Sequence, residues 1–292
     1  MEEKMKIAVI ANCQTQAISN YLRIITGCKE IVNVPVHMFG SELYLKALGS
    51  LKSIVEDENG IIFTFNLSER FGELETTNLK KIAKAKVYSI TNLYFSGFHP
   101  DITYLGSMGK RVSSPLGDLH SKIIITAFTQ GLDVNEAKNS FNNETYKALG
   151  FYEEFESSKE ELFARDANSN IQFANEFLAL VTSKHALYTM NHPIPEVLHK
   201  FACKLCEHTG IPYDNYPSEF FNNYLSNATW WLIYKEIAEF HGLKIQCPML
   251  FKQPDNKGGN VLSLNEFIVR SYQKYEDVGA HVIRDAFKEL GC

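Results

Sequence analysis

Four apolar runs of strand length alternate with helix-like patterns in the first 90 residues of the chain. The predicted strands are Ile7–Ile10, Ile31–Val36, Ile61–Phe65 and Lys86–Ile90. The helical patterns between them are Thr15–Ile25, Glu42–Leu51 and Glu73–Ala83. Strands separated by helices of this length form right-handed crossovers within a parallel sheet. The sequence therefore predicts an α/β fold for this part of the chain.

The pattern changes after the fourth predicted strand. Residues 92–117 show little periodicity and are rich in Gly, Ser, Pro and aromatic residues, which is typical of a functional loop. Asp118 is then the predicted N-cap of a helix at residues 119–129, and Gly131 is its stop. We expect an α/β subdomain at residues 1–117 and a helical region at 118–292. No Pro- or Ser-rich linker separates the two, so we expect one integrated body.

The rest of the chain shows helical periodicity almost throughout. The predicted helices are Asn135–Phe141, Glu144–Leu149, Ser158–Arg165, Ile171–Ser183, Pro195–His208, Ala228–Phe240, Leu264–Tyr275 and Val278–Leu290. Leu243–Cys247 is a weak strand candidate, and we predict no other strand in this part.

Composition narrows the class of protein. The net charge of −5 and the pI near 6.0 give no reason to expect a nucleic-acid partner. No apolar run approaches the ~20 residues that span a bilayer. The six cysteines are scattered, as is typical of reduced thiols. We therefore expect a cytoplasmic protein. No Gly-x-Gly-x-x-Gly follows the first strand, so a dinucleotide fingerprint is absent.

Asn12-Cys13-Gln14 lies where the first predicted strand turns into a helix. Backbone N–H groups and the helix dipole stabilise anions at such a position, and the same field favours a thiolate. Cys13 is thus a candidate nucleophile, and the amides of Asn12 and Gln14 could orient a carbonyl or a phosphate. The alternative is a buried cysteine that only packs.

His99-Pro100-Asp101 lies in the loop that follows the fourth strand and begins near Asn92. We expect this loop to face the cysteine turn, because both follow strands of one parallel sheet. His99 could act as a base, and Asp101 could fix its tautomer. The alternative places His99 on the surface and makes Asp101 a turn cap.

Three further groups could bind a ligand. Lys110-Arg111 could meet a phosphate, or could be a solvated charge pair. His120-Ser121 is expected in the first turn of the next helix, where backbone donors point at an anion. Asn191-His192-Pro193 leads into a helix. The alternative to a ligand-binding role is a plain helix-entry turn with Pro near the first helical position.

A histidine and cysteine cluster at residues 199–208 could mimic a metal site. His199, Cys203 and Cys206 share one helical face, and His208 follows them. Structural zinc sites usually draw ligands from two chain segments, whereas these all come from one helix and its end. We therefore expect core packing here and predict no metal.

The chain resembles the WcbI-type polysaccharide-biosynthesis family over residues 5 to about 210. The resemblance rests on the order and spacing of Asn12-Cys13-Gln14, Asn92, His99-Pro100-Asp101, His120-Ser121 and Asn191-His192-Pro193. The resemblance implies a small parallel α/β subdomain, flavodoxin- or SGNH-like, built into a mainly helical cradle with coenzyme A in a deep pocket. Ala11 departs from the glycine typical of the family, and Ser96 from an expected proline.

The resemblance further implies an acyl-coenzyme A-dependent O-acetyltransferase that acts on a sugar hydroxyl of a capsular or other surface-polysaccharide precursor. The implied catalytic residues are Cys13, His99 and Asp101. The candidate cofactor-binding residues, from these stretches and from the Lys110-Arg111 pair, are Asn12, Gln14, Asn92, Lys110, Arg111, His120, Ser121 and His192. The acetyl group could pass through Cys13, or His99 could activate the sugar for direct attack. The alternatives are an SGNH-like carbohydrate esterase or deacetylase, and a non-catalytic binder of coenzyme A or nucleotide metabolites.

Overall fold

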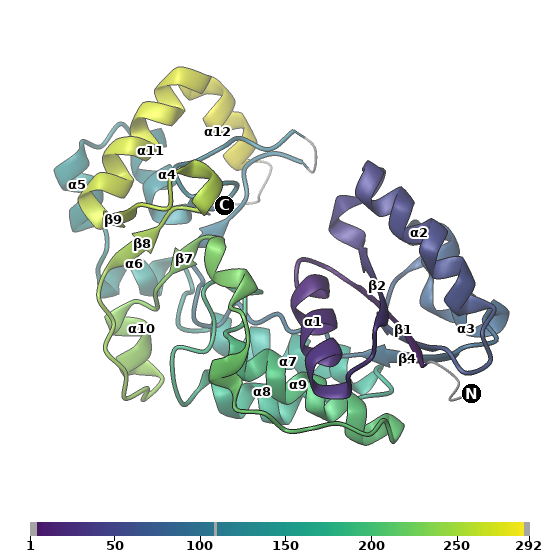
Figure 1. Cartoon of the computed structure of the whole chain (residues 1–292). Coiled ribbons are helices and arrows are strands. Elements are labelled where there is room, and N and C mark those ends of the chain that lie inside the picture. Colours follow the sequence, from purple (N-terminus) through teal and green to yellow (C-terminus); the bar gives the residue numbers. More distant parts are fainter. Residues whose placement is uncertain (1–4, 108–109, 289–292) are drawn as a thin grey trace. The chain divides into compact units, whose positions relative to one another are not determined.

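The computed structural model describes residues 5–107 and 110–288 (Figure 1). The chain forms two compact units, each assembled from three separate segments. Unit 1 consists of Met1–Tyr94, Glu160–Val181 and Asn191–Leu225. Unit 2 consists of Phe95–Lys159, Thr182–Met190 and Ser226–Cys292. The domain boundary that we expect at residues 117 and 118 stays a prediction.

Unit 1 contains a parallel four-stranded sheet in the order β2-β1-β3-β4, which confirms the α/β fold. The strands are β1 (Lys6–Ala11), β2 (Glu30–Pro35), β3 (Ile61–Phe65) and β4 (Lys86–Ile90). Each predicted strand is correct to within a residue at either end. Ile7, Ala8, Val9, Ile10 and Ala11 of the inner strand β1 are completely buried, as is usual for a sheet covered on both faces.

The crossover helices of unit 1 are α1 (Thr15–Thr26), α2 (Glu42–Val55) and α3 (Thr76–Ile82). Figure 1 shows α1 on one side of the sheet and α2 with α3 on the other. The apolar stripe of α1 is buried, and this helix packs against α9 (Pro195–Thr209). Gly27 ends α1 in the left-handed conformation, with φ of 66°, which a residue without Cβ adopts at little cost.

Further short elements complete unit 1. They are the 3₁₀ helices η1 (Val36–Met38), η2 (Glu69–Leu74) and η3 (Ser218–Phe220), and the helix α8 (Ala174–Val181). The predicted start of α8 at Ile171 is wrong. Ile171 is instead extended beside β4, where its N–H donates to the carbonyl of Ser89 at 3.0 Å.

Unit 2 contains two small antiparallel sheets. One pairs β5 (Ile102–Thr103) with β6 (His120–Ser121), and the other has the order β7-β8-β9. The strands of the second sheet are β7 (Trp230–Trp231), β8 (Leu250–Lys252) and β9 (Val261–Ser263). The expectation of no strand in this part beyond Leu243–Cys247 is therefore wrong, and that segment itself forms no strand.

The helices of unit 2 are α4 (Lys122–Thr129), α5 (Val134–Asn139), α6 (Asn143–Ala148), α10 (Lys235–Phe240), α11 (Leu264–Val278) and α12 (Ala280–Lys288). The helix expected at Ala228–Phe240 begins only at Lys235. The N–H of Trp231 donates to the carbonyl of Tyr188 at 2.7 Å, and its ring packs on Phe251 and Phe267. These tertiary contacts fix Trp231 in a strand. The predicted end of α12 at Leu290 lies outside the described residues.

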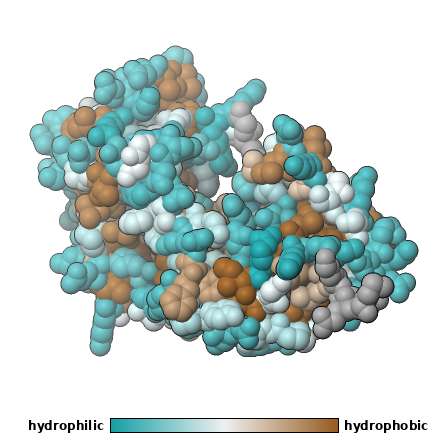
Figure 2. All heavy atoms as spheres, in the orientation of Figure 1, coloured by the Kyte–Doolittle hydropathy of each residue, from teal (hydrophilic) through white to brown (hydrophobic). Residues whose placement is uncertain are grey.

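Three elements remain outside these groups. The helix α7 (Glu154–Ala167) contains the boundary between residues 159 and 160, and the 3₁₀ helix η4 (Tyr224–Asn227) contains the one between residues 225 and 226. The 3₁₀ helix η5 (Asp255–Lys257) connects β8 to β9 in unit 2. Hydrophilic side chains predominate on the face in Figure 2, in agreement with the burial of the apolar strands. In the part of the chain that is described, no helix has the length and apolar character needed to cross a membrane.

Candidate functional site

The turn between β1 and α1 is closed by Asn12. Its side-chain oxygen accepts a hydrogen bond from the N–H of Gln14 at 3.0 Å, and its carbonyl accepts from the N–H of Thr15 at 3.1 Å. Such a turn is typical of asparagine, whose side chain satisfies backbone donors two residues on. Asn12 is therefore held rigidly where β1 ends.

Gln14 joins three segments of unit 1 that are far apart in the sequence. Its amide nitrogen donates to the carbonyls of Leu93 and Asn191, both at 2.9 Å, and its side chain is completely buried. One contact holds the loop after β4, and the other holds the segment before α9. Both side-chain protons of Gln14 are used by the backbone, so the structure gives this residue a positioning role. The ligand contact that we expect from it stays a prediction.

Cys13 lies between two amide side chains. Its sulfur is 3.8 Å from the side-chain oxygen of Asn12, and the side-chain nitrogen of Asn191 is 3.7 Å from that sulfur. Burial raises the pKa of the Cys13 thiol to about 12, and a backbone hydrogen bond offsets this only in part. This shift opposes the thiolate expected from the sequence, because desolvation disfavours the charged form of a buried thiol.

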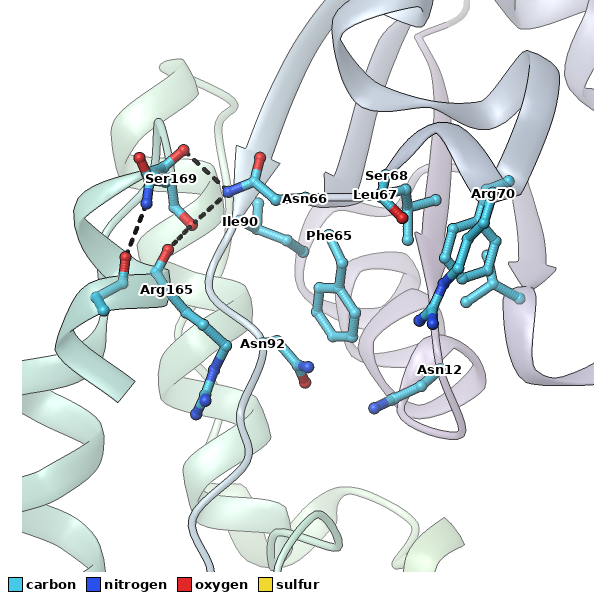
Figure 3. Close-up of a pocket in the computed structure, with 14 residues that line it drawn as sticks. Asn12, Phe65, Asn66, Leu67, Ser68, Arg70, Ile90, Asn92, Arg165 and Ser169 are labelled. Carbon is cyan, nitrogen blue, oxygen red and sulfur yellow. Dashed lines mark hydrogen bonds between the residues drawn. The ribbon is translucent and has the colours of Figure 1, made fainter. Parts of the chain in front are cut away.

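A pocket of about 550 Å³ opens in unit 1 beyond the carboxyl ends of β1, β3 and β4 (Figure 3). Asn12 follows β1, Ser68 and Arg70 follow β3, Asn92 follows β4, and Arg165 comes from α7. Ligands of open α/β sheets commonly bind at this edge. The pocket brings together Asn12 and Asn92, both predicted from the sequence, and adds polar residues that the sequence analysis missed.

Two of the missed residues are arginines. Arg165 donates to the carbonyl of Tyr94 at 2.8 Å and lies 3.4 Å from the carboxylate of Glu161, and burial lowers its pKa. Arg70 is exposed, and its guanidinium lies 4.8 Å from the ring centre of Phe71. None of the described residues that line the pocket is Asp or Glu. The pocket thus has two cationic side chains and no anionic one among its described residues.

His99 and Asp101 belong to unit 2. His99 is 2% exposed, so the surface alternative is wrong, and burial lowers its pKa to about 4. The main chain of Trp231 offsets this in part, although neither ring nitrogen reaches hydrogen-bond geometry with a partner among the described residues. The ring is therefore neutral at pH 7, the form that a general base requires.

Asp101 is directed to the start of α4. Its carboxylate accepts from the N–H of Ile123 at 3.0 Å and from the hydroxyl of Tyr234 at 2.6 Å. Burial raises the pKa of this carboxyl, and hydrogen bonds from Ser121, Tyr234 and Ile123 oppose the shift. No hydrogen bond links it to His99 in the described part of the chain. The capping alternative therefore describes Asp101, and control of the His99 tautomer is not seen.

We expect His120 and Ser121 in the first turn of a helix, but this prediction is wrong. The two residues form β6, whose backbone pairs with Ile102 and Thr103 of β5. The ring nitrogens of His120 lie 2.9 Å from the hydroxyl of Tyr275 and 2.9 Å from the carbonyl of Val112. Burial lowers the pKa of His120 to about 4. Ser121 is the N-cap of α4, so the predicted cap at Asp118 is wrong.

Lys110 and Arg111 also lie in unit 2. Lys110 is exposed, whereas the guanidinium of Arg111 lies 3.8 Å from the ring centre of Tyr104 and 3.6 Å from the carboxylate of Asp118. Arg111 is thus already stacked and paired. Phosphate binding by these two residues stays a prediction.

His192 belongs to unit 1 and follows Asn191, which contacts Cys13. Burial, and to a lesser degree the charge of His37, lower the pKa of His192 to about 4. The proline at the first turn of α9 is Pro195 rather than Pro193.

His199 Nε2 is 3.6 Å from the sulfur of Cys203 on the same helix. Within the described ranges no group of three or more potential ligands could hold a metal ion.

The predicted site residues fall into two sets, one in each unit of the chain. Unit 1 brings together Asn12, Cys13, Gln14 and Asn92, with Asn191 and His192 from the segment before α9. The other predicted residues, namely His99, Asp101, Lys110, Arg111, His120 and Ser121, belong to unit 2.

The family described as polysaccharide biosynthesis enzyme WcbI matches residues 6–214. The chain therefore belongs to the WcbI family of polysaccharide biosynthesis enzymes. A solved structure of WcbI, described as a novel polysaccharide biosynthesis enzyme in its native form without a disulfide bond between coenzyme A and a cysteine, is similar over 99% of this chain and 95% of that chain. The TM-score is 0.73 at 16% sequence identity, so the two share a fold. No curated protein matches the chain.

Proposed function

We propose that this protein transfers an acetyl group from acetyl-coenzyme A to a sugar hydroxyl of a surface-polysaccharide precursor. Family membership supports a role in polysaccharide biosynthesis. The solved WcbI structure, whose description mentions coenzyme A and a cysteine without a disulfide bond between them, supports the cofactor. The observation that carries the proposal is the turn at the end of β1, where Cys13 lies between the amides of Asn12 and Asn191, and Asn12 also lines the pocket of unit 1.

Direct transfer is the route that we favour. The sugar oxygen attacks the thioester carbonyl, coenzyme A leaves as its thiolate, and the hydroxyl proton passes to a base. Amide donors near Cys13, such as the side chain of Asn191, would stabilise the oxyanion that forms in between. His99 of unit 2 remains the base expected from the sequence; burial keeps its ring neutral at pH 7, but a pKa of about 4 makes it a weak proton acceptor.

A covalent relay through Cys13 is less favourable. With a pKa of about 12, only roughly one thiol in 10⁵ is ionised at pH 7, and the thiolate is the nucleophilic form. Thioester-to-oxygen transfer needs no acyl-enzyme. Cys13 would then contribute to the shape and polarity of the turn rather than carry the acetyl group.

The test is to mix the protein with acetyl-coenzyme A and to follow thiol release, with and without candidate sugars. We expect release only when an acceptor is present, and no acetyl adduct on Cys13 by intact-mass analysis. An adduct that a sugar then removes would establish the covalent relay. Release of acetate from acetylated sugars without coenzyme A would instead establish the esterase.

Binding is tested independently of turnover. Coenzyme A at about 100 times its Kd adds about 2.7 kcal/mol to the free energy of unfolding. We expect a corresponding rise in the thermal midpoint. If millimolar coenzyme A leaves the midpoint unchanged, the assignment of the cofactor fails.

A further inference from the structure

We propose that the pocket of unit 1 contains an anion subsite in which Arg70 and Arg165 bind a phosphate or diphosphate group of a substrate. The inference deepens the proposed function, on which it rests, by naming the chemistry that this pocket recognises. Figure 3 shows the two arginines on opposite sides of the space in front of Phe65 and Asn92.

The charges around the pocket favour an anion. Arg70 makes no ion pair within the described part of the chain. Arg165 pairs with Glu161 through one nitrogen only, and its Nε is buried with no partner among the described residues. A planar guanidinium presents donors in a fork that matches phosphate oxygens. The described lining thus holds two guanidinium groups and no carboxylate; Glu161, outside the lining, offsets the charge of Arg165, and the charge of Arg70 is not offset by an ion pair in the described part of the chain.

Arg165 is held in place before any ligand binds. One nitrogen donates to the carbonyl of Tyr94 at 2.8 Å. The next residue, Asp166, is buried, accepts from the hydroxyl of Thr91, and accepts from the N–H of Phe173 at 2.9 Å. These contacts fix the end of α7 against the segment after β4. A side chain positioned in advance loses less freedom when it binds an anion.

The ligand also carries hydrogen-bond donors. Asn92 lines the pocket, and its side-chain oxygen is buried with no partner among the described residues. A buried acceptor without a partner is costly, and a hydroxyl of a ribose or a hexose would satisfy it. A pocket of about 550 Å³ is within the usual range for a small-molecule site. A phosphate joined to a sugar fits this combination of groups.

Two substrates of the proposed reaction could supply this chemistry. One is the diphosphate of coenzyme A, and the other is a phosphorylated or nucleotide-linked sugar acceptor. We would measure binding of inorganic pyrophosphate, coenzyme A and a nucleoside-diphosphate sugar by titration calorimetry. The variants are Arg70→Gln, Arg70→Lys and Arg165→Gln, and the matched control is Arg284→Gln, which changes an exposed arginine of α12 in unit 2.

We expect pyrophosphate to bind, and Arg70→Gln and Arg165→Gln each to weaken this binding by roughly tenfold or more. Arg70→Lys should have a smaller effect because the charge remains, and Arg284→Gln should have none. Arg165→Gln also removes the contact with Tyr94, so a thermal melt must show that it is folded. If it is not, Arg70→Gln decides the result. The proposal is overturned if pyrophosphate does not bind, or if folded Arg70→Gln binds all three probes as tightly as the unchanged protein.

Competition identifies the source of the phosphate. Displacement of pyrophosphate by coenzyme A assigns the subsite to the acyl donor. Binding of pyrophosphate to protein already saturated with coenzyme A, together with displacement by the nucleotide sugar, assigns it to the acceptor. If arginine-dependent pyrophosphate binding persists but no acetyl transfer is found with any sugar, the subsite stands and the proposed transferase activity fails.

Discussion

Cys13 and Gln14 are neighbours in the sequence, but their side chains have different environments and different roles at the end of β1. Gln14 is completely buried and uses its amide to hold two backbone carbonyls in place. Cys13 remains partly exposed, yet its sulfur is surrounded closely enough for burial to raise its pKa to about 12. The sequence predicts where both residues lie, because the strand and helix patterns are local. Their environments depend on segments far along the chain, which no local pattern reveals.

Cys13 is expected to react slowly with iodoacetamide at pH 7, since its thiol is protonated. The rate should rise steeply as the pH increases from 9 towards 12. Mass spectrometry of the labelled peptides measures this, and the same protein in denaturant is the control in which Cys13 reacts freely. Equal rates at pH 7 in the native and denatured protein would contradict the burial of this thiol.

Replacement of Gln14 tests its positioning role. Gln14→Leu leaves the carbonyls of Leu93 and Asn191 without their donor, and we expect a loss of about 2 to 4 kcal/mol in the free energy of unfolding. Urea denaturation measures the loss. Gln273→Leu, at an exposed position of α11, is the matched control and should change stability little. Equal effects of the two changes would show that the buried hydrogen bonds contribute nothing.

The polar residues of the pocket show how far strand position alone can identify a site. Asn12 and Asn92 were predicted because each follows a strand of the parallel sheet. Ser68 and Arg70 follow β3 in the same way, so the same argument applied to the third strand would have found them. Arg165 comes from α7, and only the folded chain places it at this edge. Its role could not be read from the sequence.

At the scale of the element, the start of α4 shows why a cap can be misassigned. Asp118 has the residue type and spacing of an N-cap, but it is exposed and pairs with Arg111. Ser121 caps the helix locally, and Asp101, 22 residues before Ile123, accepts from the N–H of that residue. A cap from another segment leaves no local signal. The two- and three-residue strands of unit 2 were missed for a related reason, because alternation needs more residues to be visible.

The cap from Asp101 should be worth more than an exposed one. Asp133→Ala removes the exposed capping box of α5 and should cost about 1 kcal/mol. Asp101→Ala also leaves the buried hydroxyl of Tyr234 without its acceptor, so we expect roughly 3 kcal/mol or more. Chemical denaturation of both variants measures the difference. Similar costs for the two would show that burial adds nothing to this cap.

At the scale of the whole molecule, three histidines should make stability depend on pH. Burial lowers the pKa values of His99, His120 and His192 from 6.5 to about 4 in each case. Each favours the folded state while it is neutral. That contribution is fully present above pH 6.5 and is lost as the pH falls from 6.5 to 4, because the unfolded chain binds the protons first.

We therefore expect the thermal midpoint to fall steeply between pH 6.5 and pH 4. His120→Gln should make this dependence shallower, since one buried histidine is gone, while His281→Gln at an exposed position of α12 should not. Scanning calorimetry at several pH values measures the slopes. An unchanged slope for His120→Gln would contradict the assignment of a neutral buried ring.

The helix α9 is made late in the synthesis of the protein, although it packs against a helix that is made early. It packs against α1, yet it belongs to the last segment of unit 1, which ends about 130 residues after the first segment. A ribosome adds roughly 5–20 residues per second, so the first segment emerges on the order of ten seconds before its last partner. During that time the apolar face of α1 has no covering helix. Until Thr209 at the end of α9 has left the ribosome, the side of α1 that faces α9 therefore lacks its native partner, while its contacts with β1 and β2 can already form.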